Sequence, residues 1–409
     1  MINEPTIQYI SEHATDDVAH LALHPSKDPQ VDMPMALQQI AGRQKAKEKL
    51  PDWYATPGIL YPKKVSLEQC SSSQTADYKA SLVEGKSFAD LSGGFGVDTI
   101  ALARKFEKGS YVEPQEELCE LFQHNSKTLG INNITIVQNT MENVIDEMEA
   151  VDVIYLDPSR RDGHGKRVVA LEDCSPNLLE WKSVLLDKCK TLMVKLSPMI
   201  DLHQILRQLP EIYALHVIAV NGECKEVVFL ISCRDAINRV STNETKIVAV
   251  DICNNTTDAP CRDAINRVST TVETERTAPL SIASQIGTYL YEPNAALMKA
   301  GIFNSISQQF QVQKLEKNTN LFTSDELQEN FPGRIFRIEA VHEFHQRKTA
   351  KELSHLESAS IAVRNFPLSA DELRKTLKIK DGNACYLFGC KLWDGRKVVV
   401  VCEKLAVSY

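Results

Sequence analysis

Residues 87–99 read SFADLSGGFGVDT, and this stretch decides the fold that the sequence predicts. It begins as a short apolar strand, passes through a glycine-rich turn and leads into a helix that we expect over 99–106. Glycines in the turn let the backbone approach a ligand where a Cβ would collide, and the start of the following helix offers free N–H donors. The stretch therefore predicts a small-molecule site at the end of the first strand of an α/β domain.

Six further strand-like runs follow this stretch. They are short and apolar, and they lie at 110–113, 134–138, 151–157, 191–196, 215–220 and 226–232. Amphipathic stretches separate the earlier runs, and this alternation predicts right-handed βαβ units in a mostly parallel sheet. Only the short segment 221–225 joins the last two runs. Because a parallel crossover needs a longer connection, we expect an antiparallel hairpin at the end of the sheet.

Length and composition narrow the class of protein. The chain has 409 residues, enough for about two to four domains. A hydrophobic content of 43% and a charged content of 24% are typical of a globular protein and argue against global disorder, a collagen-like chain or a disulfide miniprotein. No window approaches the ~18 consecutive apolar residues of a membrane helix, and we recognise no secretory signal at the N-terminus. We expect a cytoplasmic protein that does not span a membrane.

Cysteine and histidine positions do not favour a metal centre. The 11 cysteines include no C-x-x-C pair, which argues against zinc ribbons and thioredoxin-like motifs, and we expect buried thiols in a reducing compartment. His342 and His345 form an H-x-x-H pair, which is a weak zinc signal without further ligands. We therefore expect no metal.

The charges around the glycine turn favour one class of cofactor. The glycines fall as G-G-x-G, Asp90 precedes them, and Glu113 closes the next predicted strand, where a carboxylate can accept both hydroxyls of a ribose. Asp90 would repel the pyrophosphate of a dinucleotide but attract the ammonium and sulfonium groups of S-adenosylmethionine. The sequence thus favours S-adenosylmethionine over NAD; a turn required only for packing is the structural alternative.

A second motif, Asp157-Pro158-Ser159-Arg160, follows the fourth predicted strand. Ligands of such sheets bind beyond the carboxyl ends of the strands. A rigid proline after the aspartate holds its carboxylate in place, where it can accept a hydrogen bond from an exocyclic amino group and orient the nitrogen lone pair toward a methyl carbon. The motif predicts methyl transfer; a turn in which the aspartate caps a helix is the alternative.

These motifs resemble a known family. DLSGGFGVD, YVEP and DPSRRD, in that order, and the antiparallel final hairpin resemble class I S-adenosylmethionine-dependent methyltransferases, which have a Rossmann-like seven-stranded core. Residues 69–82, 289–301 and 365–382 resemble a bacterial group of these enzymes in which a ferredoxin-like segment and a THUMP-like domain follow the catalytic domain. THUMP domains generally bind RNA, so the resemblance implies an RNA substrate, rRNA or tRNA, methylated at a base nitrogen.

The resemblance implies roles for individual residues. Five residues of the first motif would surround the methionine end of the cofactor: Asp90, Ser92, Gly93, Gly94 and Gly96. Glu113 would bind the ribose, and Asn139 and Thr140 occupy the adenine-contact position, where many methyltransferases have an aspartate instead of Thr140. Asp157 and Pro158 match the catalytic (D/N)-P-P-(Y/F) motif. Ser159 and Arg160 depart from it, so stacking on a flat base must come from elsewhere.

Further side chains have more than one interpretation. Arg160 and Arg161 can hold a phosphate or pair with nearby acids. Lys195, at the end of the fifth strand, can contact substrate phosphate, act as a base or form a salt bridge with Asp157. Upstream hydroxyls can cap the cofactor or only a helix: Ser71, Ser72 and Thr75.

The tail is basic. Residues 334–409 carry 14 basic and 9 acidic side chains, although the whole chain has a net charge of −8. A group of lysines and arginines there would bind the RNA backbone if they share one face: Lys375, Lys378, Lys380, Arg396 and Lys397. An ordinary solvated surface is the alternative.

The predicted order of domains follows from these assignments. We expect a helical N-terminal region at 1–80, a methyltransferase domain at 81–232, a ferredoxin-like segment at 276–333 and a THUMP-like domain at 334–409, the last two as small α+β modules. CRDAINRVST occurs at both 233–242 and 261–270, so we interpret 233–275 as a duplicated surface insertion or linker.

Three functional alternatives stay open: methylation of a protein or small molecule, RNA binding without catalysis, and an NAD-dependent oxidoreductase, which Asp90 disfavours.

Overall fold

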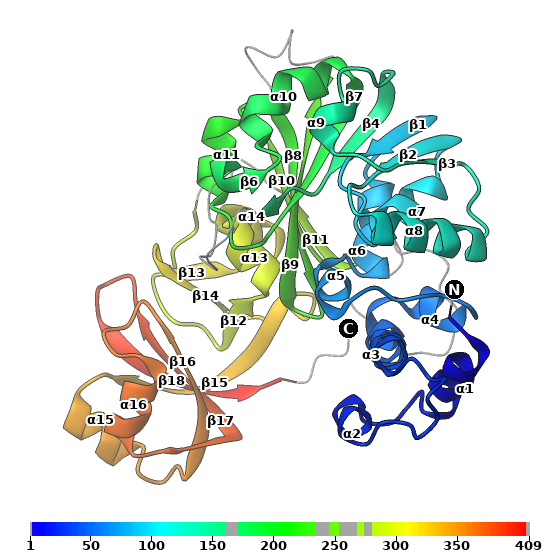
Figure 1. The fold of residues 1–409 in the computed structure, drawn as a ribbon. Coiled ribbons are helices and arrows are strands. Elements are labelled where there is room, and N and C mark those ends of the chain that lie inside the picture. Colours follow the sequence, from blue (N-terminus) through cyan, green and yellow to red (C-terminus); the bar gives the residue numbers. More distant parts are fainter. Residues whose placement is uncertain (1, 161–170, 234–244, 253–267, 274–279, 406–409) are drawn as a thin grey trace. The chain divides into compact units, whose positions relative to one another are not determined.

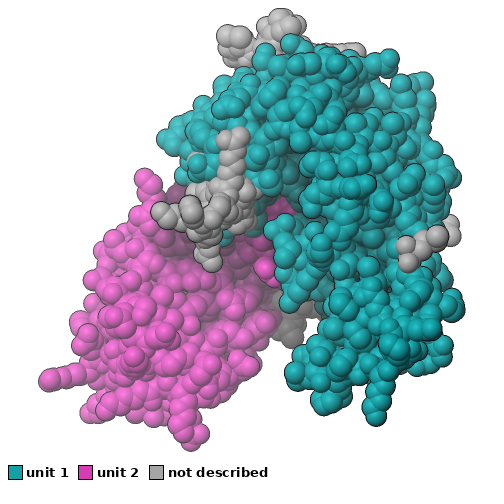
Figure 2. Space-filling view, viewed as in Figure 1, with its two compact units in different colours: residues 1–215, 227–245, 257–266 teal, residues 216–226, 246–256, 267–409 magenta. Residues whose placement is uncertain are grey.

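A computed structural model of the chain describes residues 2–160, 171–233, 245–252, 268–273 and 280–405. Two compact units make up the chain, and Figure 2 shows them in different colours. The first unit consists of residues 1–215, 227–245 and 257–266, and the second of residues 216–226, 246–256 and 267–409.

Helices form the N-terminal region, as predicted. They are α1 (Glu4–Glu12), α2 (Val18–Leu23), α3 (Met33–Lys49), α4 (Pro51–Ala55), α5 (Lys64–Gln69) and α6 (Ser73–Ser81). The longest, α3, starts where the sequence indicates, because the Asp32 side chain accepts a hydrogen bond from the Met35 N–H and Pro34 lies in the first turn. Trp53 of α4 is buried and packs against Phe95 of the glycine turn, with 4.8 Å between ring centroids. The N-terminal region thus supports the turn directly.

A nine-stranded sheet carries the predicted core. Its strand order is β11-β10-β8-β9-β7-β4-β1-β2-β3 (Figure 1). The central strands are β1 (Ser87–Asp90), β2 (Lys108–Val112), β3 (Ile134–Val137), β4 (Val151–Leu156), β7 (Cys189–Leu196), β8 (Ile212–Val220) and β9 (Glu223–Ser232). Five strands run parallel to one another, in the order β3, β2, β1, β4 and β7. The next strand, β9, is antiparallel to β7. The Rossmann-like α/β fold is therefore confirmed.

Helices and short elements connect these strands. They are α7 (Val97–Ala103), α8 (Glu116–Thr128), α9 (Met141–Val144), β5 (Ser159–Arg160), η1 (Leu171–Asp173), β6 (Cys174–Ser175), α10 (Leu178–Asp187) and α11 (Leu202–Gln208). Strands β5 and β6 form a separate two-stranded ribbon directly after β4. The ribbon therefore adjoins the carboxyl end of β4, where the second motif lies.

The interpretation of residues 233–275 as a surface insertion or linker is wrong for two segments. β10 (Lys246–Ile252) and β11 (Val268–Glu273) pair antiparallel and extend the nine-stranded sheet. The reason is local: 246–252 reads KIVAVDI, a β-rich apolar run, and all its residues from Val248 to Ile252 are buried. Residues 268–270, the end of the second CRDAINRVST copy, belong to β11. Of the first copy only Cys233 lies within the described residues.

The second unit contains a seven-stranded sheet of order β13-β14-β12-β15-β18-β17-β16. Its elements are β12 (Tyr289–Pro293), α13 (Ala295–Ala300), α14 (Phe303–Gln309), β13 (Gln313–Glu316), β14 (Thr319–Ser324), β15 (Gly333–Glu343), α15 (Gln346–Glu352), β16 (Ser358–Arg364), α16 (Ala370–Leu377), β17 (Lys380–Lys391) and β18 (Lys397–Lys404). β17 and β18 form the hairpin that Asp394-Gly395 predicts, with Gly395 at a φ of +88°. Because β12 pairs with β15, the two predicted modules share one sheet.

Candidate active site

The glycine turn between β1 and α7 is tightly packed. A Cβ on Gly93 would lie 2.3 Å from the Tyr111 ring, and one on Gly96 would lie 2.2 Å from the Phe122 ring. Gly94 and Gly96 also adopt positive φ, at +54° and +84°. The Tyr111 and Phe122 rings stack 4.0 Å apart, and the Tyr111 hydroxyl donates to the Gly94 carbonyl at 2.6 Å. The two rings pack directly against Gly93 and Gly96, which are buried, whereas Gly94 is partly exposed and a Cβ on it would meet no atom closer than 3.7 Å.

Asp90, at the end of β1, is a buried acid whose hydrogen bonds within the described residues come from no cationic side chain. Its carboxylate accepts hydrogen bonds from the Ser92 N–H (3.0 Å), the Ser92 hydroxyl (3.2 Å) and the Thr99 hydroxyl (2.6 Å). Burial raises the pKa of Asp90 to about 7, although these hydrogen bonds oppose the shift. Its negative charge is therefore present only around neutral pH and above.

Glu113 follows β2 and supports the same turn. One of its carboxylate oxygens accepts the N–H of Gly94 at 2.9 Å, and the other accepts the N–H of Gln115 at 3.0 Å. Each carboxylate oxygen can accept a second hydrogen bond, so these contacts leave acceptor capacity for two hydroxyls. The position predicted for ribose binding is thus held rigidly against the turn.

Asn139 and Thr140 lie between β3 and α9. The side-chain oxygen of Asn139 accepts the Thr140 N–H and the Asn143 side-chain amide, each at 2.9 Å. Thr140 is the N-cap residue of α9, and its side chain makes no capping hydrogen bond. Asn139 therefore stabilises its own loop.

Asp157 and the glycine turn meet at one hydroxyl. The Asp157 N–H donates to the Ser92 hydroxyl oxygen at 2.7 Å, while that hydroxyl donates to Asp90. The Asp157 carboxylate forms an ion pair with Lys195, with 2.6 Å between Oδ2 and Nζ. Burial raises the pKa of Asp157, and the charge of Lys195 is the largest opposing influence. Ser92 thus connects the two motifs that the sequence singles out.

The rest of the second motif is divided between a buried turn and the β5–β6 ribbon. Pro158 is buried, and the Ser159 hydroxyl donates to the Ser175 carbonyl at 3.2 Å. Arg160 pairs with Cys174 in the ribbon, and Arg161 lies outside the described residues. Ser159 is therefore engaged in holding the ribbon beside Asp157.

Sequence reasoning misses a buried polar network next to Asp157. Lys79 of α6 forms an ion pair with Asp98 of α7, with 2.9 Å between Nζ and Oδ1. The Ser71 hydroxyl donates to Asp98 at 2.8 Å, and so does the Tyr155 hydroxyl at 2.9 Å. Burial opposes the ionisation of Asp98, but the charges of Lys79 and Lys195 outweigh it and lower its pKa. A strand tyrosine, a helical lysine and an acid after a glycine turn give no separate sequence signal.

Comparison with known proteins identifies the family. Residues 73–195 match the family model of conserved hypothetical protein 95, residues 289–332 that of a ferredoxin-like domain, and residues 333–404 that of a THUMP-like domain. A crystal structure named "putative methyltransferase from Porphyromonas gingivalis W83" has 30% sequence identity and a TM-score of 0.83, covering 99% of this chain and 100% of that chain. The chain belongs to this methyltransferase family. No curated protein matches it significantly.

Two other solved structures resemble only part of this methyltransferase-family chain. An rRNA methylase from Streptococcus thermophilus has 16% identity and a TM-score of 0.29, covering 39% of this chain and 93% of that chain. A ribosomal protein L11 methylase from Lactobacillus delbrueckii subsp. bulgaricus has 16% identity and a TM-score of 0.30, covering 43% and 82%. Scores this low do not bear on the substrate.

The basic residues predicted to bind RNA fall into two groups in the family member described here. Lys375, Lys378 and Lys380 are exposed around the end of α16 and the start of β17. Arg396 and Lys397 are exposed at the start of β18, which pairs with the other end of β17. Arg396 forms an ion pair with Asp394 at 2.6 Å. The five residues therefore do not form one cluster.

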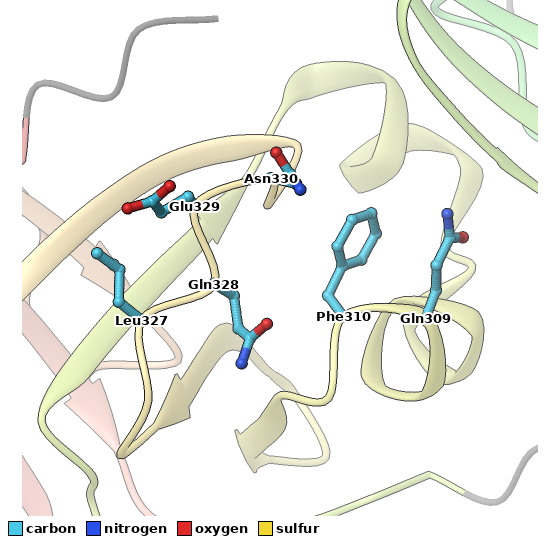
Figure 3. A pocket seen from close by; sticks show the side chains of 6 residues that line it. All are labelled: Gln309, Phe310, Leu327, Gln328, Glu329 and Asn330. Carbon is cyan, nitrogen blue, oxygen red and sulfur yellow. The ribbon is translucent and has the colours of Figure 1, made fainter.

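The remaining features of the described residues concern a pocket, a metal centre and a membrane span. A surface hollow of about 430 Å³ in the second unit is lined by none of the predicted site residues; Figure 3 shows its lining of Gln309, Phe310, Leu327, Gln328, Glu329 and Asn330. No group of three or more metal-ligating side chains occurs in the part of the chain that the structure describes. Over the same residues, every helix is too short or too polar to cross a bilayer.

Proposed function

We propose that this chain transfers a methyl group from S-adenosylmethionine to a base nitrogen of rRNA or tRNA. One observation carries the proposal: the Ser92 hydroxyl joins Asp90 of the glycine turn to the backbone of Asp157. A cofactor held at the turn and a nucleophile held at Asp157 would then lie at the same edge of the sheet, as methyl transfer requires.

The residues at the turn fit S-adenosylmethionine. Gly94, at the centre of the turn, is partly exposed and carries no side chain, so its backbone is accessible to a ligand. Asp90 supplies negative charge for a cationic methionine end, and Glu113 keeps acceptor capacity for ribose hydroxyls. When bound, the cofactor supplies an activated methyl group on a sulfonium leaving group. Asn139 and Thr140 would contact the adenine.

Asp157 would orient the acceptor. Within the described residues its Oδ2 is tied to Lys195, whereas no hydrogen bond is made to Oδ1. Oδ1 can accept a hydrogen bond from an N–H of the acceptor nitrogen, which turns the nitrogen lone pair toward the methyl carbon. Pro158 holds the turn after Asp157, and Ser159 anchors the ribbon that carries Arg160. The nitrogen that gains the methyl group loses one proton, which passes through Asp157 to solvent.

An RNA acceptor is supported by the THUMP-like match and the exposed basic residues of the second unit. Residues 333–404 match the THUMP-like family model, and five exposed basic residues lie within them. Exposed lysines and arginines attract a phosphate backbone, and that attraction weakens with salt. The acidic net charge of the whole chain favours confining RNA contact to such places.

The test is methyl transfer from tritium-labelled S-adenosylmethionine by the purified full-length chain. The acceptors are rRNA and tRNA from cells lacking the gene, the same RNA from wild-type cells, and a ribosomal-protein fraction. Label in RNA from the deletion cells, but not from wild-type cells, supports the proposal. Label in protein instead would assign a protein acceptor, and bound cofactor without label in any fraction would favour RNA binding without catalysis.

A further inference from the structure

A chain of buried polar groups leads away from Asp157. The Lys195 side chain, at the end of β7, is only 8% exposed, and its Nζ lies 2.6 Å from Asp157 Oδ2 and 3.4 Å from the Ser71 hydroxyl. That hydroxyl also accepts a hydrogen bond from Lys79 at 2.6 Å. Lys79 is 2% exposed and pairs with Asp98. Ser71 thus connects the Lys195–Asp157 ion pair to the Lys79–Asp98 ion pair.

Burying this many charges is costly. A lysine removed from water loses hydration, and an ion pair regains that loss only with favourable geometry and additional hydrogen bonds. Elsewhere in this unit Lys182 and Glu211 form an equally short pair, at 2.6 Å, with both side chains about a quarter exposed. Lys195 is more deeply buried than Lys182, and ionisable groups in such perturbed environments concentrate at functional sites.

The two oxygens of Asp157 have different surroundings. Oδ2 is held by Lys195, and in the described part of the chain Oδ1 receives no hydrogen bond. The Asp157 side chain is 35% exposed, so the carboxylate can be reached from solvent. A carboxylate fixed through one oxygen presents the other in one direction, which is the arrangement needed to orient a bound acceptor.

We propose that Lys195 is a positioning residue for methyl transfer, which fixes Asp157 through Oδ2 so that Oδ1 accepts the N–H of the acceptor. The charge of Lys195 also favours the ionised form of that carboxylate. The inference rests on the proposed function, since it assigns a role within the same site. Ser71 and Lys79 hold Lys195 in place from the N-terminal side. Lys195 itself does not touch the acceptor.

The charges facing Asp157 come from three elements. Lys195 of β7 and Lys79 of α6 favour its ionised form, and Asp98 of α7 disfavours it. Burial already raises the pKa of Asp157 while Lys195 is present. Removing the Lys195 charge would raise that pKa further, because the largest opposing influence would be lost.

The test uses the full-length chain carrying Lys195→Met or Lys195→Arg, with Lys182→Met as a control that breaks a pair of equal length. Carbon-13 NMR of aspartate carboxyls follows the titration, and Asp157→Asn assigns the signal. We expect the Asp157 midpoint to rise by about one pH unit or more in Lys195→Met and to stay near the wild-type value in Lys195→Arg and Lys182→Met.

Methyl transfer to RNA from the deletion cells supplies the second readout. Below the Asp157 midpoint of the wild type we expect kcat of Lys195→Met to be about tenfold lower, with recovery at higher pH and little change in KM. Calorimetric binding of S-adenosylmethionine within about twofold of wild type would show that the variant is folded.

The outcomes separate the two proposals. An unchanged Asp157 titration in Lys195→Met, or an equal loss of rate at every pH, overturns the positioning role and leaves the proposed function in place. A wild-type chain that methylates no acceptor overturns the proposed function, and the positioning role fails with it.

Discussion

Asp157 in the first unit and Glu292 in the second are both acids that pair with basic side chains, but they differ in what remains open. Glu292, in β12, is buried, and Arg334 and Arg364 bind its two oxygens separately. In Asp157 a lysine holds one oxygen, and the described residues leave the other without a hydrogen bond. Two arginines neutralise the Glu292 carboxylate, which joins β12 to β15 and β16, whereas Asp157 keeps an oxygen that a ligand can reach.

Asp90 adds a third arrangement. Hydroxyls and a backbone N–H surround it, and none of its hydrogen bonds in the described chain comes from a charged group. Burial without a nearby cation raises its pKa to about 7. Under the proposed function, Glu292 would be structural, Asp157 would orient an acceptor, and Asp90 would meet the positive charge of the cofactor, since its hydrogen bonds within the described residues come from no cation.

We expect the largest effect from Asp157→Asn, which tests whether Asp157 differs from Glu292 by taking part in the reaction. This change keeps the size of the side chain but replaces the carboxylate that would orient the acceptor. We expect the rate of methyl transfer to fall about 100-fold or more. S-adenosylmethionine binding, measured by calorimetry, should stay within about twofold of wild type. A variant that retains most of its rate would exclude Asp157 from the reaction.

Glu292→Gln tests the opposite case. The substitution removes the charge that holds Arg334 and Arg364, so we expect a loss of about 2 kcal/mol in the free energy of unfolding of the second unit. Urea unfolding measures it, with Lys225→Ala as a control, because the Lys225–Glu223 pair is exposed. The rate at which the folded protein methylates RNA at saturating concentration should not change. A large loss of rate with no loss of stability would contradict the structural role.

The pH dependence of cofactor binding tests whether the charge of Asp90 contributes to the affinity for S-adenosylmethionine. If the cationic cofactor binds only when Asp90 is ionised, affinity should fall about tenfold from pH 8 to pH 6. The free energy of unfolding should change in the opposite direction. Because the pKa of Asp90 is higher in the folded chain than in the unfolded chain, its contribution to this free energy decreases as pH rises from about 4 to 7. Calorimetry at several pH values checks the affinity, and Asp90→Asn should remove its pH dependence. A flat affinity profile in the wild type would exclude this charge effect.

The smallest expected effects concern the two basic groups of the second unit. Lys378 lies just before the start of β17, and Lys397 of β18 pairs with the last residue of β17. Lys378→Ala and Lys397→Ala should each weaken RNA binding a few-fold and lower the slope of log affinity against log salt by about one. Fluorescence anisotropy with a labelled tRNA measures both. An effect of only one variant would place the RNA at that end of β17, and no effect of either would remove these residues from the interface.

The core of the fold could be predicted because its signals are local. The glycine turn, Glu113 after β2 and Asp157 after β4 lie at strand ends, and parallel strands bring their carboxyl ends to one edge. The sequence prediction does not include β10 and β11, although residues 246–252 are apolar, because a duplicated, polar sequence surrounds this run. Whether such a run joins a sheet depends on an open strand edge, which is a property of the folded chain.

The sequence by itself determined the order of strands and helices, the glycines of the turn and the acids Asp90, Glu113 and Asp157, because hydrophobic periodicity and turn chemistry act between near neighbours. Only the tertiary structure decided that Lys79, Asp98 and Lys195 meet at Ser71, more than a hundred residues from Lys195. It also decided that Lys380 and Lys397 lie apart. Burial and charge pairing depend on segments that are distant along the chain, so the role of a lysine is settled only when the chain has folded around it.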